Sequence, residues 1–261
     1  MAGRLRKCEC SSNTLDGCVQ IEIYADVVCP WSYLGKRRLE VALAGSPLGP
    51  EAILRWRPFQ LDPDAPRTSQ PLMTWLARRL GGPGNARAAA DEVIRIGSAE
   101  GLTFDYDRAV IGNTFDAHRL LWFADQPEAV FFGATADTQP ELVEALHRAH
   151  FADGLDLTDH DVLVALAAGV DLDPDRVAAL LSSREGTADV RGHLARAYDL
   201  GITSVPTFVF AGTYAVTGAQ DARAMTSVLA EVARRERLTP TAGALIPHQR
   251  TAVADGDARV G

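Results

Sequence analysis

Hydrophobic and polar positions alternate over residues 19–25 (VQIEIYA), in a run rich in β-branched side chains, and this pattern predicts a β-strand. A short turn follows, and residues 31–44 then carry apolar side chains at helical spacing until a Gly-Ser-Pro sequence ends the pattern. Residues 53–59 (ILRWRPF) predict a second strand. The ordered chain therefore begins with a strand–helix–strand unit, and Cys29 lies where the first strand meets the helix.

The pattern changes after a proline-rich connector. From residue 71 to about residue 185 it is nearly all helical, and the expected helices cover residues 72–80, 86–100, 113–124, 139–151, 158–168 and 174–181. A further helix over residues 187–200 leads into two short strands, at residues 207–210 and 214–217, and residues 222–237 predict a closing amphipathic helix.

This order predicts an α/β fold, in which a thioredoxin-like domain is interrupted by a large α-helical insertion. The expected division is a disordered N-terminal tail (1–18), a thioredoxin-like domain (19–60 and 187–238), an α-helical insertion domain (61–186) and a loose C-terminal tail (239–261).

Composition narrows the class of protein. The chain has 261 residues, 47% hydrophobic content and a net charge of -8, without a basic stripe, so we expect no nucleic-acid partner. No apolar run approaches the roughly 18 to 20 residues of a membrane-spanning helix, so no membrane partner is expected. The basic start is not followed by the apolar stretch of a secretory signal. These features predict a cytoplasmic protein whose thiols are kept reduced.

Cys29 is the candidate nucleophile. A helix N-terminus can lower the pKa of a cysteine, because its unpaired N–H groups and dipole favour a negative charge, and we expect this effect at Cys29. Pro30 suits the first helical turn, and Trp31 can form an apolar wall beside the sulfur.

Three motifs resemble those of the FrnE-like branch of the DsbA family. They are DVVCPWSYLGK at residues 26–36, NTFDAHRL at residues 113–120 and GITSVPTF at residues 201–208, the last continuing to GAQ at residues 218–220. The similarity spans residues 19–237. It implies a thioredoxin fold with a helical insertion, and a cis-Pro206 that faces the reactive cysteine. A cis-Pro206 would leave the backbone of Val205 free to pair with substrate.

Ser32 departs from that pattern, because such oxidoreductases usually carry Cys-x-x-Cys. A hydroxyl cannot attack and release a mixed disulfide, so a self-contained redox cycle is excluded at this motif. Ser32 can instead hydrogen-bond the Cys29 thiolate. Related kappa-class glutathione transferases and 2-hydroxychromene-2-carboxylate isomerases resemble this site, with Ser-Pro-Tyr-Ser-like motifs. Those isomerases act by reversible thiol addition.

Three functions remain open for a lone thiol. Our first expectation is an enzyme that isomerises (cis–trans) a conjugated small molecule through a transient Cys29 adduct, in specialised metabolism. The second is a monothiol thiol–disulfide oxidoreductase resolved by an external thiol, and the third is a non-catalytic binding protein. No cofactor is expected, except that a small thiol such as glutathione could take part. Related proteins often pair, which leaves a homodimer open.

The sequence also suggests roles for residues around Cys29 and for the histidines and the other cysteines. Cys29 and Ser32 are the expected catalytic residues, and the expected substrate-binding residues are Trp31, Tyr33, Asn113, His118, Val205, Pro206 and Gln220. His118 is either a proton shuttle or a buried structural histidine. The three-residue spacing of His147 and His150 predicts a shared, solvated helix face rather than a metal site. Cys8, Cys10 and Cys18 are expected to be free thiols of the tail, although one of them could act as a mobile resolving thiol.

Overall fold

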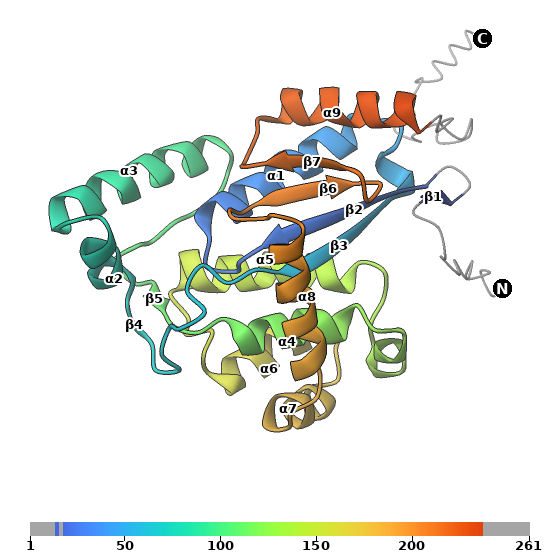
Figure 1. Ribbon diagram of the computed structural model, residues 1–261. Helices are drawn as coiled ribbons and strands as arrows, with labels where there is room; N and C mark the ends of the chain where they lie inside the picture. Colours follow the sequence, from blue (N-terminus) through green and yellow to red (C-terminus); the bar gives the residue numbers. More distant parts are fainter. Residues whose placement is uncertain (1–13, 16–17, 237–261) are drawn as a thin grey trace, which may run out of the picture.

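A five-stranded sheet organises the computed structural model, which describes residues 14–15 and 18–236. The central strand β2 (Cys18–Ala25) pairs in parallel with β3 (Ala52–Pro58) and antiparallel with β6 (Thr207–Phe210), which in turn pairs with β7 (Tyr214–Thr217). The short β1 (Thr14–Leu15) pairs with the start of β2. Figure 1 shows β2 and β6 side by side although they come from opposite ends of the chain.

Helices cover both faces of this sheet (Figure 1). Helix α1 (Pro30–Ala44) packs against α9 (Ala222–Arg235) on one face. On the other face, α4 (Phe115–Ala124), α5 (Thr138–Arg148) and α8 (Thr187–Asp199) all contact β3. The central strand β2 is therefore covered on both faces, and the α/β thioredoxin-like fold with a helical insertion is confirmed.

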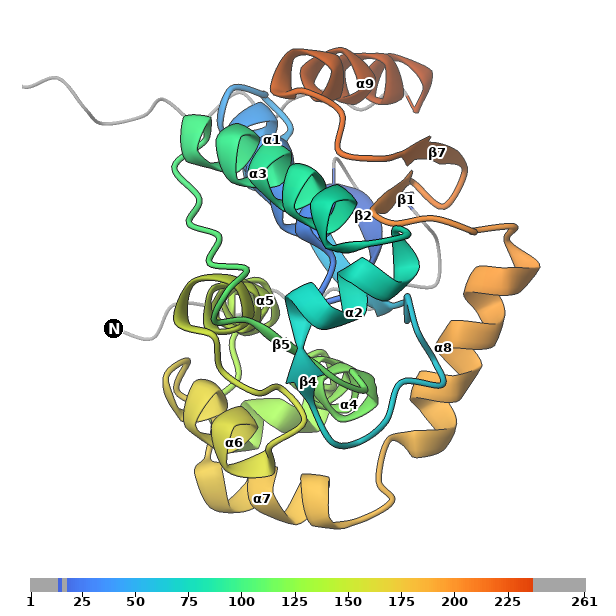
Figure 2. The same ribbon diagram turned by 90° about the vertical axis from the view of Figure 1, so that its left-hand side faces the viewer.

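The long segment between β3 and α8 is mainly helical. Besides α4 and α5 it contains β4 (Gln70–Pro71), α2 (Leu72–Arg79), α3 (Pro83–Ala99), β5 (Val110–Ile111), the 3-10 helix η2 (Pro127–Phe132), the π-helical turn η3 (Ala149–Asp153), α6 (His160–Ala168) and α7 (Pro174–Ser182). A further 3-10 helix, η1 (Gly49–Glu51), precedes β3. Figure 2 shows α2 and α3 on the α1 side of the β4–β5 pair, and α6 and α7 beneath α4 and α5.

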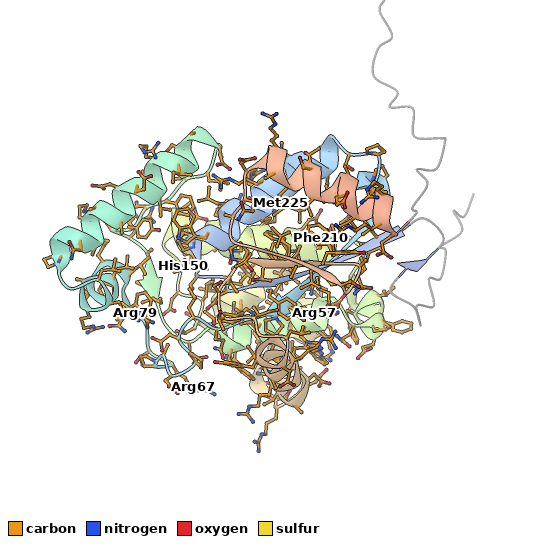
Figure 3. The ribbon with its side chains drawn as sticks, turned by 45° about the horizontal axis from the view of Figure 1, so that its top comes forward. Arg57, Arg67, Arg79, His150, Phe210 and Met225 are labelled. Atoms are coloured by element: carbon orange, nitrogen blue, oxygen red, sulfur yellow. The ribbon has the colours of Figure 1, made fainter. Side chains whose placement is uncertain are left out.

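The main core lies where the sheet meets these helices. Fully buried aliphatic side chains of β2, among them Ile21 and Ile23, stand opposite Phe210 and Phe208 of β6 in the strand register. Met225 of α9 is also fully buried in this cluster, and Figure 3 labels it together with Phe210. Alternation along β2 therefore directs one set of apolar side chains toward α1 and α9.

The N-terminal boundary differs from the expected one. The expected disordered tail covered residues 1–18, but Thr14 and Leu15 form β1 and Cys18 begins β2, because their backbones pair across an antiparallel register. Residues 1–13, 16–17 and 237–261 lie outside the described residues, and with them Cys8, Cys10 and the expected C-terminal tail. Within the described part of the chain, no helix combines the length and the apolar character that a membrane span requires.

Candidate active site

Cys29 occupies the position just before α1, where the chain leaves β2. Its N–H donates to the Asp26 carbonyl at 3.0 Å, and its own carbonyl accepts from the N–H groups of Ser32 and Tyr33 at 3.0 and 3.3 Å. Pro30 is the first helical residue and therefore removes no hydrogen bond from the helix. The Cys29 side chain is only 3% exposed, whereas the neighbouring Trp31 is 41% exposed.

The loop before β6 covers the sulfur. The Val205–Pro206 peptide bond is cis, and the Cys29 thiol lies 3.8 Å from the Val205 carbonyl oxygen, to which it donates. Cys29 and Val205 share a small apolar cluster with Ile202. The structure thus brings together Cys29, Val205 and Pro206, three expected site residues that are far apart in the sequence.

The thiol does not have the lowered pKa that a helix start predicts. Burial among apolar side chains raises the pKa of Cys29 to about 11, because the anion would lose its hydration. Hydrogen bonds from Ser32 lower this pKa, and the negative charge of Asp26 raises it again. This shift in the pKa of Cys29 is opposite to the one expected at a helix start, because desolvation outweighs the hydrogen bonds from Ser32 and Trp31 in the first turn of α1.

Asp26 is a buried acid that the sequence reasoning missed. Its Oδ2 accepts from the Leu61 N–H at 2.8 Å, and its Oδ1 lies 3.4 Å from Nε2 of His118, which is also buried. The same Nε2 lies 3.0 Å from the Phe59 carbonyl oxygen, so this nitrogen must carry the proton. An aspartate that ends an apolar strand three residues before the cysteine was the available signal. His118 is thus held beside Asp26 and the active-site loop.

Two other expected contact residues point elsewhere. Tyr33 is buried, donates its hydroxyl to Glu144 at 2.8 Å and stacks on His147 with ring centroids 4.9 Å apart. These contacts pack α1 against α5. The Gln220 side chain donates to the Thr217 carbonyl at 2.9 Å in the turn after β7, and no described contact joins it to Cys29.

Asn113 has a structural role in the loop before α4. Its Nδ2 donates to the carbonyls of Pro63 and Ala65, both at 3.1 Å, while its Oδ1 accepts from the Phe115 N–H at 2.9 Å and from Gln60 at 3.2 Å. The bonds to Gln60, Pro63 and Ala65 fasten the connector after β3 to the start of α4. Asn113 also borders a polar pocket, so it remains next to a surface that a ligand can reach.

His147 and His150 are interior residues, which corrects the expected solvated face. Both are fully buried, and burial lowers the pKa of His147 to about 4 and that of His150 to about 3. The Nδ1 of His147 lies 2.8 Å from the Val143 carbonyl oxygen. They are therefore neutral at pH 7, and the described residues contain no group of three or more candidate metal ligands.

Comparison with known proteins identifies the family. The model of the DSBA-like thioredoxin domain matches residues 20–230. A probable DsbA oxidoreductase from Streptomyces coelicolor is 34% identical, with a TM-score of 0.75, and the match covers 92% of this chain and 94% of that one. The chain belongs to the DsbA-like thioredoxin family.

More distant members of this fold differ in their reactions. A 2-hydroxychromene-2-carboxylate isomerase is 15% identical with a TM-score of 0.58, over 84% of this chain and 98% of that one. The cytosolic disulfide reductase DsbM from Pseudomonas aeruginosa, solved with GSH, is 19% identical with a TM-score of 0.51, over 84% and 98%. At these identities the likeness concerns the fold alone. The DsbA-like fold therefore occurs in both oxidoreductases and an isomerase. Because the fold alone does not determine the reaction, the function must be argued from the site residues of this chain.

Proposed function

We propose that this DsbA-family protein is a single-thiol enzyme that isomerises a conjugated small molecule, cis to trans, through a transient adduct on Cys29. The observation that carries this proposal is Ser32, which is fully buried at the position where a dithiol enzyme holds its second cysteine. A reaction without net redox needs only one sulfur. Specialised metabolism, in which conjugated carbonyl compounds are common intermediates, is the proposed setting.

The proposed step balances without an oxidant. The Cys29 thiolate attacks the β-carbon of a conjugated carbonyl, a C–S bond forms, and the π-electron pair moves to the carbonyl oxygen as an enolate. The former double bond is now single and can rotate. The enolate then re-forms the double bond and expels the thiolate, so the sulfur leaves unchanged and only the geometry of the substrate differs.

Asp26 is the proposed acceptor of the thiol proton. Its charge acts on the Cys29 thiol, and its buried Oδ1 receives no hydrogen bond from the described residues, with only the 3.4 Å approach of His118. Asp26→Asn keeps an acceptor for the Leu61 N–H but removes the charge and the base. The substitution should lower the pKa of Cys29 and speed its alkylation, yet slow isomerisation. Isomerisation that is as fast as in the wild type contradicts the role of Asp26 as a base.

The main test is incubation with geometric isomers of conjugated enones and polyene acids, followed by chromatography of the products. Wild-type protein should interconvert the isomers and Cys29→Ala should not. Ser32→Ala should retain the reaction at a lower rate, because no second heteroatom is required but the hydroxyl that lowers the pKa of Cys29 is lost. Isomerisation by Cys29→Ala at the wild-type rate would sink the proposal. A Ser32→Cys variant has two thiols at this motif and is the matched comparison. It should gain disulfide-exchange activity.

Monothiol disulfide exchange is a second candidate, and the position of the Val205 carbonyl beside the sulfur favours it. An extended peptide or a small disulfide could pair with this backbone while Cys29 attacks one of its sulfurs. The Cys29–substrate disulfide must then be released by an external thiol such as glutathione. Mass spectrometry of protein purified without reductant decides the matter, because an adduct on Cys29 that added glutathione turns over supports exchange over isomerisation.

A non-catalytic binding protein is the third candidate, and the raised pKa of the Cys29 thiol favours it. A thiol with a pKa of about 11 is almost entirely protonated at pH 7 and is a poor nucleophile. This candidate predicts that Cys29→Ala binds ligands unchanged and that no adduct or product forms with any tested substrate.

A further inference from the structure

A polar pocket of about 610 Å³ lies between the connector after β3, the start of α4 and the link from α7 to α8. Its volume falls within the range of roughly 300–1,000 Å³ that small-molecule sites occupy. Its polar lining includes Arg67, Asn113, Arg119, His160, Arg184 and Arg191. Figure 3 labels Arg67, which lies on the loop between β3 and β4.

Charge distinguishes this pocket from the rest of the surface. Four arginines line it, whereas Asp116 is its single acidic lining residue, in a chain whose net charge is -8. Asp116 already accepts from Arg119 at 2.9 Å and lies 3.0 Å from Nε2 of His160. Arg119 is also buried and donates to backbone carbonyls at the end of α7. The acid of the pocket is thus neutralised by residues of the fold itself.

The other arginines keep their donors available. Among the described residues, the Arg184 side chain has no hydrogen bond or ion pair, and Arg191 contacts only the face of Phe115, at 5.7 Å from the ring centroid. Arg67 is 87% exposed on its side chain and approaches Asp116 only to 4.0 Å. Guanidinium groups present a planar set of N–H donors that matches the paired oxygens of carboxylates and phosphates.

Residues 59–61 connect this pocket with the apolar cluster that contains Cys29. Gln60 lines the pocket and donates to Asn113 at 3.2 Å. Its chain neighbours, Phe59 and Leu61, pack against the apolar cluster that contains Cys29. A molecule seated in the pocket would therefore lie beside the segment that borders the reactive sulfur.

We propose that this arginine-lined pocket binds the anionic end of the substrate, a group with several oxyanion oxygens such as a di- or tricarboxylate or a phosphate. The proposal rests on the proposed function for the reaction at Cys29 and adds the charge class of the molecule that reacts. The uncompensated guanidinium groups hold the anion, and the rest of the substrate extends along Gln60 toward Cys29.

The test uses citrate and pyrophosphate as probes, titrated by calorimetry at fixed ionic strength. The wild type should bind at least one probe saturably. In the Arg184→Gln/Arg191→Gln double variant the Kd for that probe should rise by about tenfold or more, because each lost charge-assisted contact costs a large part of the binding free energy. The matched control is Arg223→Gln/Arg234→Gln on α9, which removes the same charge from the opposite side of the molecule (Figure 1) and should change the Kd by less than about twofold.

The probes also separate the two chemistries, since binding of citrate alone identifies carboxylates and binding of pyrophosphate alone identifies phosphates. Cys29→Ala should bind the probe with the same Kd as the wild type. The binding test is therefore independent of the proposed reaction at Cys29, and either one can fail without the other. The proposal is overturned if neither probe binds to the wild type. It is also overturned if the pocket variant and the α9 control lose the same amount of affinity for the probe.

Discussion

Gly35 allows α1 to approach the Pro206 loop, and replacing it should disturb the site in a measurable way. A Cβ built on Gly35 would lie 2.8 Å from Pro206 Cγ and 3.0 Å from Phe208 Cζ. Ordinary carbon–carbon contacts are about 3.5–4.0 Å. In a Gly35→Ala variant the helix and the loop must therefore separate by several tenths of an ångström at a buried junction.

Two opposing energies set the size of the effect. Alanine stabilises a helix interior by about 1 kcal/mol relative to glycine, while overpacking of a closed core costs about 1–3 kcal/mol. Gly192 in α8 supplies the matched control, because a Cβ there meets no heavy atom within 4 Å. Gly192→Ala should thus raise the free energy of unfolding by about 1 kcal/mol. The free energy of unfolding of Gly35→Ala should be lower than that of Gly192→Ala by the overpacking cost, about 1–3 kcal/mol.

Urea unfolding measures the stabilities, and peptide-resolved alkylation with iodoacetamide measures access to Cys29. Because the Val205 carbonyl that receives the thiol hydrogen bond precedes Pro206, movement of the loop should speed alkylation several-fold in Gly35→Ala. Gly192→Ala should react like the wild type. If the two variants are stabilised equally and their Cys29 residues react at the same rate, close packing of α1 on the loop does not cover the sulfur.

Three further outcomes follow from the ionisable groups. Since burial raises the pKa of Cys29 to about 11, its alkylation rate should climb about tenfold per unit up to pH 10, and a plateau near pH 9 would refute this. Ser32→Ala removes a hydrogen bond that lowers the pKa, so alkylation of Cys29 at pH 9 should slow several-fold; an unchanged rate means that the hydroxyl does not act on the sulfur. Burial lowers the pKa values of His147 and His150 to about 4 and 3, so the unfolded chain binds more protons below about pH 6.5. The free energy of unfolding should therefore fall as the pH drops from 6.5 toward 4, and a His150→Leu variant that keeps the full slope argues against this cause.

Local patterns were sufficient to predict the elements of the thioredoxin-like domain. Alternation in β2 and helical spacing in α1 are properties of neighbouring residues, and both elements formed at the expected place. The pairs β1–β2 and β4–β5 were not expected, because two-residue strands carry no periodicity and arise from the backbone meeting across the fold.

The site was predicted less completely, since its properties depend on tertiary burial. The motifs placed Cys29 and Pro206 in one fold, but the sequence could not show that Cys29 is buried in a cluster with Val205 and Ile202, or that burial reverses the direction of its pKa shift. Helical spacing likewise put His147 on a definite face of its helix without indicating that Tyr33 stacks there. Spacing shows which residues share a face, whereas contacts with other elements decide whether that face is solvated.

Burial of Cys29 and the presence of Ser32 favour the same kind of chemistry. A dithiol exchanger must expose its sulfur to a disulfide substrate and must then hold a second thiol close enough to release the product. Here the resting sulfur is covered, protonated and hydrogen-bonded to Val205, and the neighbouring hydroxyl cannot release a mixed disulfide. In the proposed reaction, the ligand must therefore first displace the contacts that cover Cys29, and the adduct must break without a second thiol. Reversible addition to a conjugated carbonyl meets both requirements, because the bond formed in the first step is the bond broken in the last.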